Sequence, residues 1–189
     1  MRIIGGARRG LHLTPVGAGD PAAHLRPTSD RVREAIFNLL INGKASLAGD
    51  PVAGMNVLDL FAGTGALGLE ALSRGAASVT FVDDAAAAGV LLRANIAKMQ
   101  AGGATTILRR DATRLGPQTG PGFGLVFLDP PYGKGLGKAA LASAQAGGWL
   151  APGALVVWED SIPPVVPAGF ALVDQRKYGD TVVTMMRAD

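Results

Sequence analysis

The sequence predicts an α/β fold, in which a mostly parallel sheet is covered by helices and ends in an antiparallel hairpin. Three observations lead to this prediction. Beyond residue 54, short apolar runs alternate with helical patterns. The runs are apolar throughout, which is typical of parallel strands buried on both faces. The last two β-type runs are separated only by Tyr178–Asp180, a spacing that favours a hairpin.

Residues 1–44 are predicted to be a basic N-terminal extension made of a hairpin-like segment and one helix. Short β-like pieces occur at Arg2–Ile4 and Gly10–Thr14. Thr28–Asp30 offers side-chain oxygens that can cap the start of a helix. The apolar face of this helix, spaced i, i+4, i+7 and i+8, consists of Val32, Ile36, Leu39 and Leu40.

Residues 45–189 are predicted to form the α/β domain. Residues 44–54 are interpreted as a linker, and the alternation of strands and helices begins at Met55. The β-type runs are Met55–Phe61, Ser78–Val82, Ala104–Leu108, Phe123–Leu128, Ala154–Trp158, Phe170–Lys177 and Thr181–Arg187. The helical patterns are Ala66–Arg74, Ala85–Gln100 and Leu136–Ala146. Trp149 and Trp158 are expected in the core.

Composition excludes several classes of protein. The chain has 189 residues, of which 48% are apolar, enough for one domain with a sizeable core. No stretch approaches the ~20 apolar residues of a membrane-spanning helix, and the N-terminus lacks a signal-peptide pattern, so we expect a cytoplasmic protein. There is no Cys, which excludes disulfides and Cys nucleophiles. With only His12 and His24 present, no metal site is expected.

The positive charge is concentrated near the N-terminus. Residues 1–44 hold seven Lys/Arg and three Asp/Glu, a net charge of +4, whereas the remainder holds eleven and twelve, a net charge of −1. A basic arm on a near-neutral domain favours contact with nucleic acid. The alternative is an ordinary solvated surface.

A glycine-rich loop follows the first predicted strand of the α/β domain. Within Asp59–Gly68, Gly63, Gly65 and Gly68 form a G-x-G-x-x-G pattern between a strand and a helix. Glycines there let the backbone turn sharply and approach a ligand closely. The loop, including Ala62, is therefore a candidate cofactor site; the alternative is a tight turn that binds no ligand.

Two acidic residues indicate the cofactor: Asp83 fits both a dinucleotide and S-adenosylmethionine, and Asp59 favours S-adenosylmethionine. Asp83 ends the second strand, eighteen residues after Gly65, where its carboxylate can accept hydrogen bonds from both ribose hydroxyls. Asp59 precedes the glycines, where it would repel a pyrophosphate but suits the cationic methionine end of S-adenosylmethionine.

The third strand ends in Arg109–Asp111. Because parallel strands end at the same sheet edge, Asp111 and the adjoining Ala112 are expected beside the adenine, with Asp111 accepting from its amino group. Alternatively, Asp111 caps a short helix over Ala112–Leu115. The two roles are compatible.

The fourth strand ends in Asp129, Pro130, Pro131 and Tyr132, which we interpret as the catalytic segment. Two prolines remove two backbone donors and fix φ, so the turn is rigid. The Asp129 carboxylate and the Pro130 carbonyl remain as acceptors, and the Tyr132 ring offers a flat face on which a flipped-out base can stack. The alternative is a loop turn with a buried tyrosine.

Acceptors at this position favour an exocyclic amine as the target. The lone pair of a purine amine is delocalised into the ring, and hydrogen bonds from the amine to Asp129 and Pro130 would localise it. Holding the amine and the methyl group together is worth up to ~7–11 kcal/mol in well-oriented systems. Asp129 could accept the released proton. The absence of Cys also closes the route to pyrimidine C5 methylation through a Cys nucleophile.

The sequence resembles the RsmD family of bacterial 16S ribosomal RNA guanine-N2 methyltransferases over nearly its whole length. The D-P-P-Y segment alone marks amine methyltransferases in general, and the arginine-rich N-terminal string with the long glycine-loop string narrows the choice. The segments that carry the resemblance are Arg2–Gly6, Arg9–Gly10, Arg26–Glu34, Ile36–Asn38, Leu58–Ala76, Asp129–Tyr132 and Tyr178–Thr181.

The resemblance implies a Rossmann-like class I methyltransferase fold with S-adenosylmethionine at the sheet edge. It also implies a target guanine near Asp129–Tyr132, in 16S ribosomal RNA that small-subunit proteins already bind. The family often has Glu at the position of Asp83 and a further acid two residues on, where this chain has Ala85. Either Asp83 or Asp84 is therefore expected to hold the ribose, and Thr28 is a candidate contact of the methionine end.

The basic arm supplies the candidate RNA contacts. Two of them, Arg31 and Arg33, cannot both lie on the apolar helix face, so at least one should be solvent-accessible. The alternative to RNA contact is that these arginines belong to an ordinary solvated helix face. The candidates are Arg8, Arg9, Arg26, Arg31 and Arg33.

Three other functions compete with guanine-N2 methylation. An adenine-N6 methyltransferase acting on DNA or RNA would use the same chemistry, although no separate target-recognition domain is apparent. A nicotinamide oxidoreductase would leave the D-P-P-Y segment unexplained. An RNA-binding assembly factor could keep the fold without activity, although the intact Asp129 and glycine loop argue against it.

Overall fold

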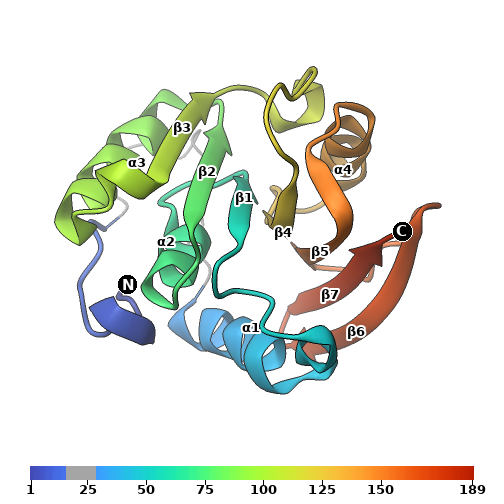
Figure 1. Cartoon of the computed structure of the whole chain (residues 1–189), viewed down its shortest axis with the longest axis horizontal. Coiled ribbons are helices and arrows are strands. Elements are labelled where there is room, and N and C mark those ends of the chain that lie inside the picture. Colours follow the sequence, from blue (N-terminus) through green and yellow to red (C-terminus); the bar gives the residue numbers. More distant parts are fainter. Residues whose placement is uncertain (16–28) are drawn as a thin grey trace.

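A seven-stranded sheet with the order β3-β2-β1-β4-β5-β7-β6 forms the centre of the described structure (Figure 1). The computed structural model describes residues 1–15 and 29–189. Strands β1 to β5 are parallel, and β7 pairs antiparallel with both β5 and β6. The strands are β1 (Asn56–Leu60), β2 (Ser78–Asp83), β3 (Thr105–Arg109), β4 (Phe123–Leu128), β5 (Leu150–Asp160), β6 (Phe170–Tyr178) and β7 (Thr181–Ala188). The predicted mostly parallel sheet with a C-terminal hairpin is thus confirmed.

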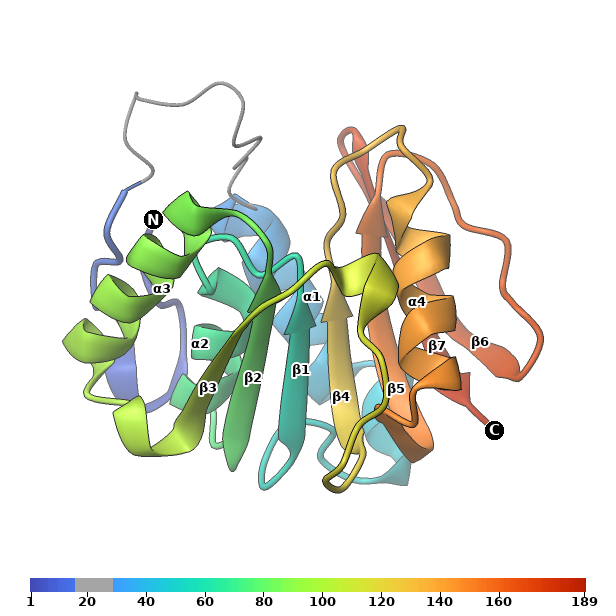
Figure 2. The ribbon, with the colours of Figure 1, turned by 90° about the horizontal axis from the view of Figure 1, so that it is seen from above.

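Helices cover both faces of this sheet (Figure 2). The first three α-helices pack on one face, and α4 packs on the other together with the short helix η5. The α-helices are α1 (Asp30–Asn42), α2 (Ala66–Ser73), α3 (Ala86–Met99) and α4 (Leu136–Ala146), and the 3₁₀ helices are η1 (Gly6–Arg8), η3 (Lys44–Ala48), η4 (Gly102–Ala104) and η5 (Ala112–Arg114). Among the described residues, no helix is long and apolar enough to cross a membrane.

The predicted elements match the observed ones within one or two residues at most ends, but β5 begins four residues before the predicted start at Ala154. Pro152 and Gly153 read as strand breakers in the sequence. The sheet accommodates them through a shift in register, because Phe123 pairs with Leu150 whereas Leu125 pairs with Leu155. An irregularity of this kind, which depends on the neighbouring strand, leaves no local pattern.

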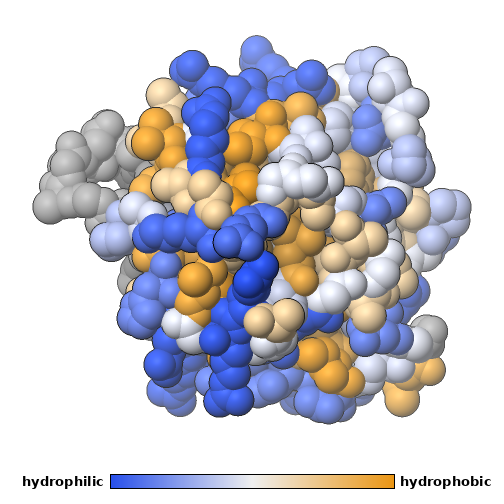
Figure 3. All heavy atoms as spheres, turned by 60° about the vertical axis from the view of Figure 1, so that its left-hand side comes forward, coloured by the Kyte–Doolittle hydropathy of each residue, from blue (hydrophilic) through white to orange (hydrophobic). Residues whose placement is uncertain are grey.

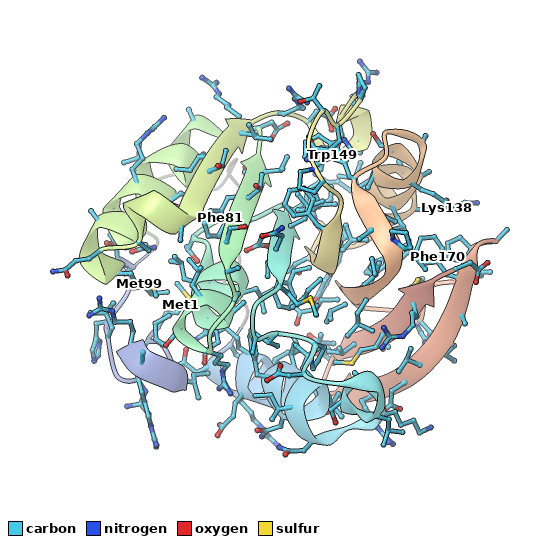
Figure 4. The ribbon with its side chains drawn as sticks, viewed as in Figure 1. Met1, Phe81, Met99, Lys138, Trp149 and Phe170 are labelled. Atoms are coloured by element: carbon cyan, nitrogen blue, oxygen red, sulfur yellow. The ribbon has the colours of Figure 1, made fainter. Side chains whose placement is uncertain are left out.

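The core consists of two layers, one on each side of the sheet. Trp149 and Trp158 are 2% and 4% exposed, which confirms that both tryptophans are core residues. Trp149, labelled in Figure 4, stacks on Phe123 with ring centroids 6.0 Å apart, and both belong to the core layer that α4 covers. The indole Nε1 of Trp149 donates to the carbonyl of Gly116 at 2.8 Å, which satisfies its buried polar atom.

The N-terminal segment folds back on itself and packs against α2. The amide of Ile3 donates to the carbonyl of Leu11 at 2.9 Å, and the amide of Gly10 donates to the carbonyl of Ile3 at 2.8 Å. The two predicted β-like pieces form a single antiparallel bridge, between Arg2 and His12, rather than strands. Ile3 belongs to the same buried cluster as the sheet residues, and the domain boundary at residue 44 remains a prediction.

Helix α1 begins where the sequence predicts. The Ser29 hydroxyl oxygen accepts from the amide of Val32 at 3.2 Å and caps the helix. Ile36, Phe37 and Leu40 are fully buried against the sheet. The apolar spacing therefore identified the buried face, while one charged residue on that face, Arg33, is also buried.

Candidate active site

The glycine loop connects β1 to α2 at the carboxyl edge of the parallel strands. Gly63 and Gly65 have φ values of 54° and 78°, a region that favours glycine. A Cβ on Gly68 would lie 2.5 Å from the Phe81 ring and 3.0 Å from Oδ2 of Asp59. The three glycines therefore serve two purposes: the first two allow the turn, and the third allows α2 to pack closely on the sheet.

Asp83 braces this loop from the end of β2. Its Oδ2 accepts from the amide of Gly63 and its Oδ1 from the amide of Ala85, each at 2.9 Å. Burial raises the pKa of Asp83, and the two backbone hydrogen bonds partly offset this. Each carboxylate oxygen has a further lone pair that a ribose hydroxyl could use. Asp84 is exposed, so either residue still qualifies as the predicted ribose contact.

Asp59 lies beneath the loop and is only 2% exposed. Its Oδ2 accepts from the amide of Gly68 at 2.9 Å. Burial raises the pKa of Asp59 well above its usual range, and the nearby carboxylates of Asp129 and Asp83 raise it further. The ends of β1, β2 and β4 thus gather three carboxylates, an arrangement that favours a cationic ligand over a phosphate.

Asp111 follows β3 at the same edge. Its Oδ1 accepts from the amide and the hydroxyl of Thr113, at 2.8 and 2.7 Å, and so caps η5. These hydrogen bonds lower the pKa of Asp111. The capping alternative is confirmed; contact with an adenine by Asp111 and the buried Ala112 remains a prediction.

The segment from Asp129 to Tyr132 leaves β4 beside the glycine loop. The amide of Asp129 lies 3.4 Å from the carbonyl of Leu60, the last residue of β1. Pro130 is buried, whereas Asp129, Pro131 and Tyr132 are half-buried at the edge. The candidate catalytic segment and the candidate cofactor loop therefore share one edge of the sheet.

The Tyr132 side chain reaches across the sheet edge to the C-terminal hairpin. Its hydroxyl lies 3.2 Å from the hydroxyl of Thr181, the first residue of β7. Burial raises the pKa of Tyr132 to about 12, and the acidic groups of Glu159, Asp129 and Asp160 add to this effect. The phenol is therefore protonated at neutral pH, which fits an aromatic surface rather than a base.

The candidate RNA-contact arginines do not lie together. Arg8 and Arg9 are exposed beyond the C-terminal end of α2, where the amide of Arg8 donates to the Ser73 hydroxyl at 2.9 Å. Since α2 starts at the glycine loop, these arginines lie about 12 Å from it along the helix. Arg31 is exposed in the first turn of α1.

The prediction that Arg33 contacts RNA is wrong, because its side chain is 0% exposed. Arg33 pairs with Asp30 at 2.9 Å, lies 3.9 Å from Glu70, and donates to the backbone carbonyl of Arg2. Its charge is thus used inside the protein. The expectation that at least one of Arg31 and Arg33 is accessible is confirmed. Arg26 and Thr28 lie outside the described residues.

Two buried polar residues near the site were missed by sequence analysis. Asn95 of α3 donates to the carbonyl of Thr64 in the glycine loop at 2.9 Å and accepts from the amide of Thr14 at 2.7 Å. It connects the loop to the N-terminal segment. The left-hand side of Figure 1, where α3 and the N-terminal segment lie, comes forward in Figure 3 and carries hydrophilic side chains interspersed with hydrophobic ones. The sequence pattern that could have revealed Asn95 is its spacing, which places a polar residue on the same helix face as Leu92 and Met99.

The other missed residue is Glu70 of α2, which is 0% exposed. Its carboxylate accepts from the amides of Ile4 and Gly5, both at 2.8 Å, and pairs with Arg74 at 2.8 Å. It fixes the N-terminal segment on α2. A cluster of metal-binding side chains does not occur in the described ranges 1–15 and 29–189.

Comparison with known proteins identifies one family over nearly the whole chain. The family model described as "Conserved hypothetical protein 95" matches residues 1–187. The Ribosomal RNA small subunit methyltransferase D of Escherichia coli K12 is 36% identical, over 100% of this chain and 90% of the relative. The protein of the same name from Haemophilus influenzae is 34% identical, over 95% and 89%. The solved structure of yhhF from Escherichia coli superposes with a TM-score of 0.82 at 36% identity, covering 100% of this chain and 98% of the other.

Proposed function

This chain belongs to the RsmD family, and from that premise we propose that it methylates the N2 amine of a guanine in 16S ribosomal RNA, using S-adenosylmethionine. The relatives are named as small-subunit ribosomal RNA methyltransferases. These names specify neither the cofactor nor the base, so S-adenosylmethionine, guanine and its N2 atom are our proposal.

One observation carries the proposal: the acceptors of Asp129 and Pro130 lie at the same sheet edge as the glycine loop. The backbone contact between Asp129 and Leu60 ties the two segments together. Three carboxylates surround the loop, which supports a cofactor that carries positive charge at its amino group and sulfonium.

The residues have distinct roles in this proposal. S-adenosylmethionine, when bound, supplies the electrophilic methyl group. Gly63 and Gly65 admit the cofactor to the loop, and Asp83 or Asp84 holds its ribose. Asp129 and the Pro130 carbonyl accept hydrogen bonds from the target amine and orient its lone pair. Tyr132, fixed by Thr181, supports the base by stacking.

The test is methyl transfer from labelled S-adenosylmethionine to small-subunit particles that lack the modification, followed by nucleoside analysis of the RNA. N2-methylguanosine is the expected product. N6-methyladenosine would keep the acceptor chemistry and overturn the assigned base. No incorporation, with cofactor binding measured separately, would favour the non-catalytic assembly factor.

We expect Asp59→Asn to stabilise the ligand-free protein at neutral pH and to weaken binding of the cationic cofactor. Burial raises the pKa of Asp59 above its ordinary value of 3.8, so the folded protein binds this proton more tightly than the unfolded chain. Wild-type stability should therefore fall as pH rises from about 4 through the folded pKa.

Thermal melts across pH check this expectation. The melting temperature of Asp59→Asn should approach that of the wild type below about pH 4 and exceed it increasingly towards neutral pH. Asp180→Asn, at an exposed hairpin position, is the control. A difference between Asp59→Asn and the wild type that is constant with pH would contradict the assignment of the buried carboxylate.

We further propose that Arg8 and Arg9 contact the RNA backbone away from the target base. Replacing both by Ala should raise the KM for RNA with little change in kcat, and should reduce the slope of log affinity against log salt by up to about two. Arg176→Ala/Lys177→Ala, at exposed positions of the edge strand β6, removes the same number of positive charges and is the control. An unchanged salt slope for Arg8→Ala/Arg9→Ala would remove this segment from the RNA site.

A further inference from the structure

Glu159 lies next to Asp129 at the catalytic edge. Leu128 of β4 pairs in register with Trp158 of β5, so the residues that follow them are neighbours on adjacent parallel strands, which lie ~4.8 Å apart. Phe127 and Val157, two residues earlier, both face the core layer under α1 to α3. Because side chains alternate along a strand, Asp129 and Glu159 project towards that same face.

Tyr132 extends over Glu159. It follows β4, and its hydroxyl contacts Thr181 at the start of β7. Strand β5 lies between β4 and β7 in the sheet, so the tyrosine side chain crosses the end of β5, where Glu159 and Asp160 lie. Both of these acids help to raise the pKa of Tyr132, which agrees with their closeness to its hydroxyl.

Glu159 is 3% exposed, whereas Asp129 is half-buried. A carboxylate shielded from water makes stronger hydrogen bonds and discriminates more sharply between donors and acceptors than an exposed one. The edge beneath Tyr132 therefore presents two adjacent carboxylates, of which one is deep and the other is at the surface. Such an edge fits a ligand with two neighbouring N–H donors.

The Watson–Crick edge of guanine has this pattern, because the ring N1–H lies beside the N2 amine. We propose that Glu159 selects guanine by accepting the hydrogen of ring N1 while Asp129 and Pro130 accept those of the N2 amine. This inference rests on the proposed function, which it deepens by assigning base specificity. A purine with a lone pair at N1, such as adenine, would face the carboxylate with an acceptor and be disfavoured.

The test uses 16S ribosomal RNA in which the nucleotide that the wild-type enzyme methylates is replaced by 2,6-diaminopurine riboside through splinted ligation. This base keeps the amine at C2 but has a lone pair at N1. In reconstituted small-subunit particles, the wild type should prefer guanine by on the order of 10²-fold in kcat/KM, the cost of one mispaired buried hydrogen-bonding group. Glu159→Gln offers an amide donor to the N1 lone pair, so it should reduce that preference at least tenfold.

Guanine and diaminopurine also differ at C6, where guanine has an oxygen and diaminopurine an amine. Testing both RNAs with both enzymes cancels this difference, because it is the same for the wild type and for Glu159→Gln. Asp160→Asn is the matched control, because it removes one negative charge from the adjacent residue, whose side chain alternates to the other side of β5. It should keep the wild-type preference. A cooperative melt well above the assay temperature should show that Glu159→Gln is folded, and its cofactor affinity should stay close to wild type, which separates specificity from folding.

Each outcome decides the inference. A wild-type enzyme that methylates guanine and diaminopurine equally well overturns it without any variant. An unchanged preference in Glu159→Gln, or an equal change in Asp160→Asn, also overturns it, while N2-methylguanosine from the wild type leaves the proposed function standing. Absence of N2-methylguanosine from the wild type overturns both.

Discussion

Asp129→Ala should lower kcat for methyl transfer by on the order of 10³-fold, with cofactor affinity close to that of the wild type. Asp129 follows β4 at the sheet edge, and its carboxylate is the acceptor proposed to orient the amine and to take its proton. General base groups of this kind contribute ~10²–10⁴-fold. The hydrogen bond from the Gly63 amide to Asp83 does not involve Asp129, so the glycine loop should keep its shape and cofactor binding should survive the loss of one of the three nearby carboxylates.

Single-turnover methylation of small-subunit particles and calorimetric titration with S-adenosylmethionine would measure the two effects separately. Asp129→Asn keeps one acceptor oxygen and should lose less activity than Asp129→Ala. Asp160→Asn, a half-buried acid at the end of the next strand, serves as the control. Normal turnover in Asp129→Ala would refute the proposed mechanism.

Glu70→Gln should reduce the free energy of unfolding by about 3 kcal/mol, because breaking a buried charge pair leaves a cation without full compensation. Glu70 is fully buried, and its carboxylate pairs with Arg74 at 2.8 Å and lies 3.9 Å from Arg33. It also accepts from the amides of Ile4 and Gly5. The amide of Gln can accept from these donors but carries no charge.

For a chain of this length, the expected loss corresponds to a melting temperature lower by about 6–12 °C. Glu34→Gln, at an exposed position of α1, is the matched control and should melt like the wild type. The N-terminal segment should also become more sensitive to trypsin at Arg8 and Arg9, because its backbone anchor on α2 is weakened. If Glu70→Gln and Glu34→Gln melt alike, the Glu70 network does not stabilise the fold.

Most of the fold was predictable because its signals are local. Fully apolar runs such as Phe123–Leu128 identify buried parallel strands, and the spacing of Ile36 and Leu40 identifies the buried face of α1. The start of β5 was not predictable, since it depends on how β4 accommodates Pro152 and Gly153. The N-terminal pieces pair with each other only at the bridge between Arg2 and His12, because the next amides, of Ile4 and Gly5, donate to Glu70 of α2 instead of to a strand.

The sequence by itself determined the two segments of the candidate site that consist of consecutive residues, the glycine loop and Asp129–Tyr132. Their conformations follow from the dihedral preferences of Gly and Pro, which are properties of these residues themselves and need no distant contact. Only the tertiary structure decided which polar residues are buried. Glu70 and Asn95 find their partners 65 to 81 residues away in the N-terminal segment. The cost of burying a polar group depends on such distant partners, so Arg33 could be read as an RNA contact although it is a core ion-pair residue.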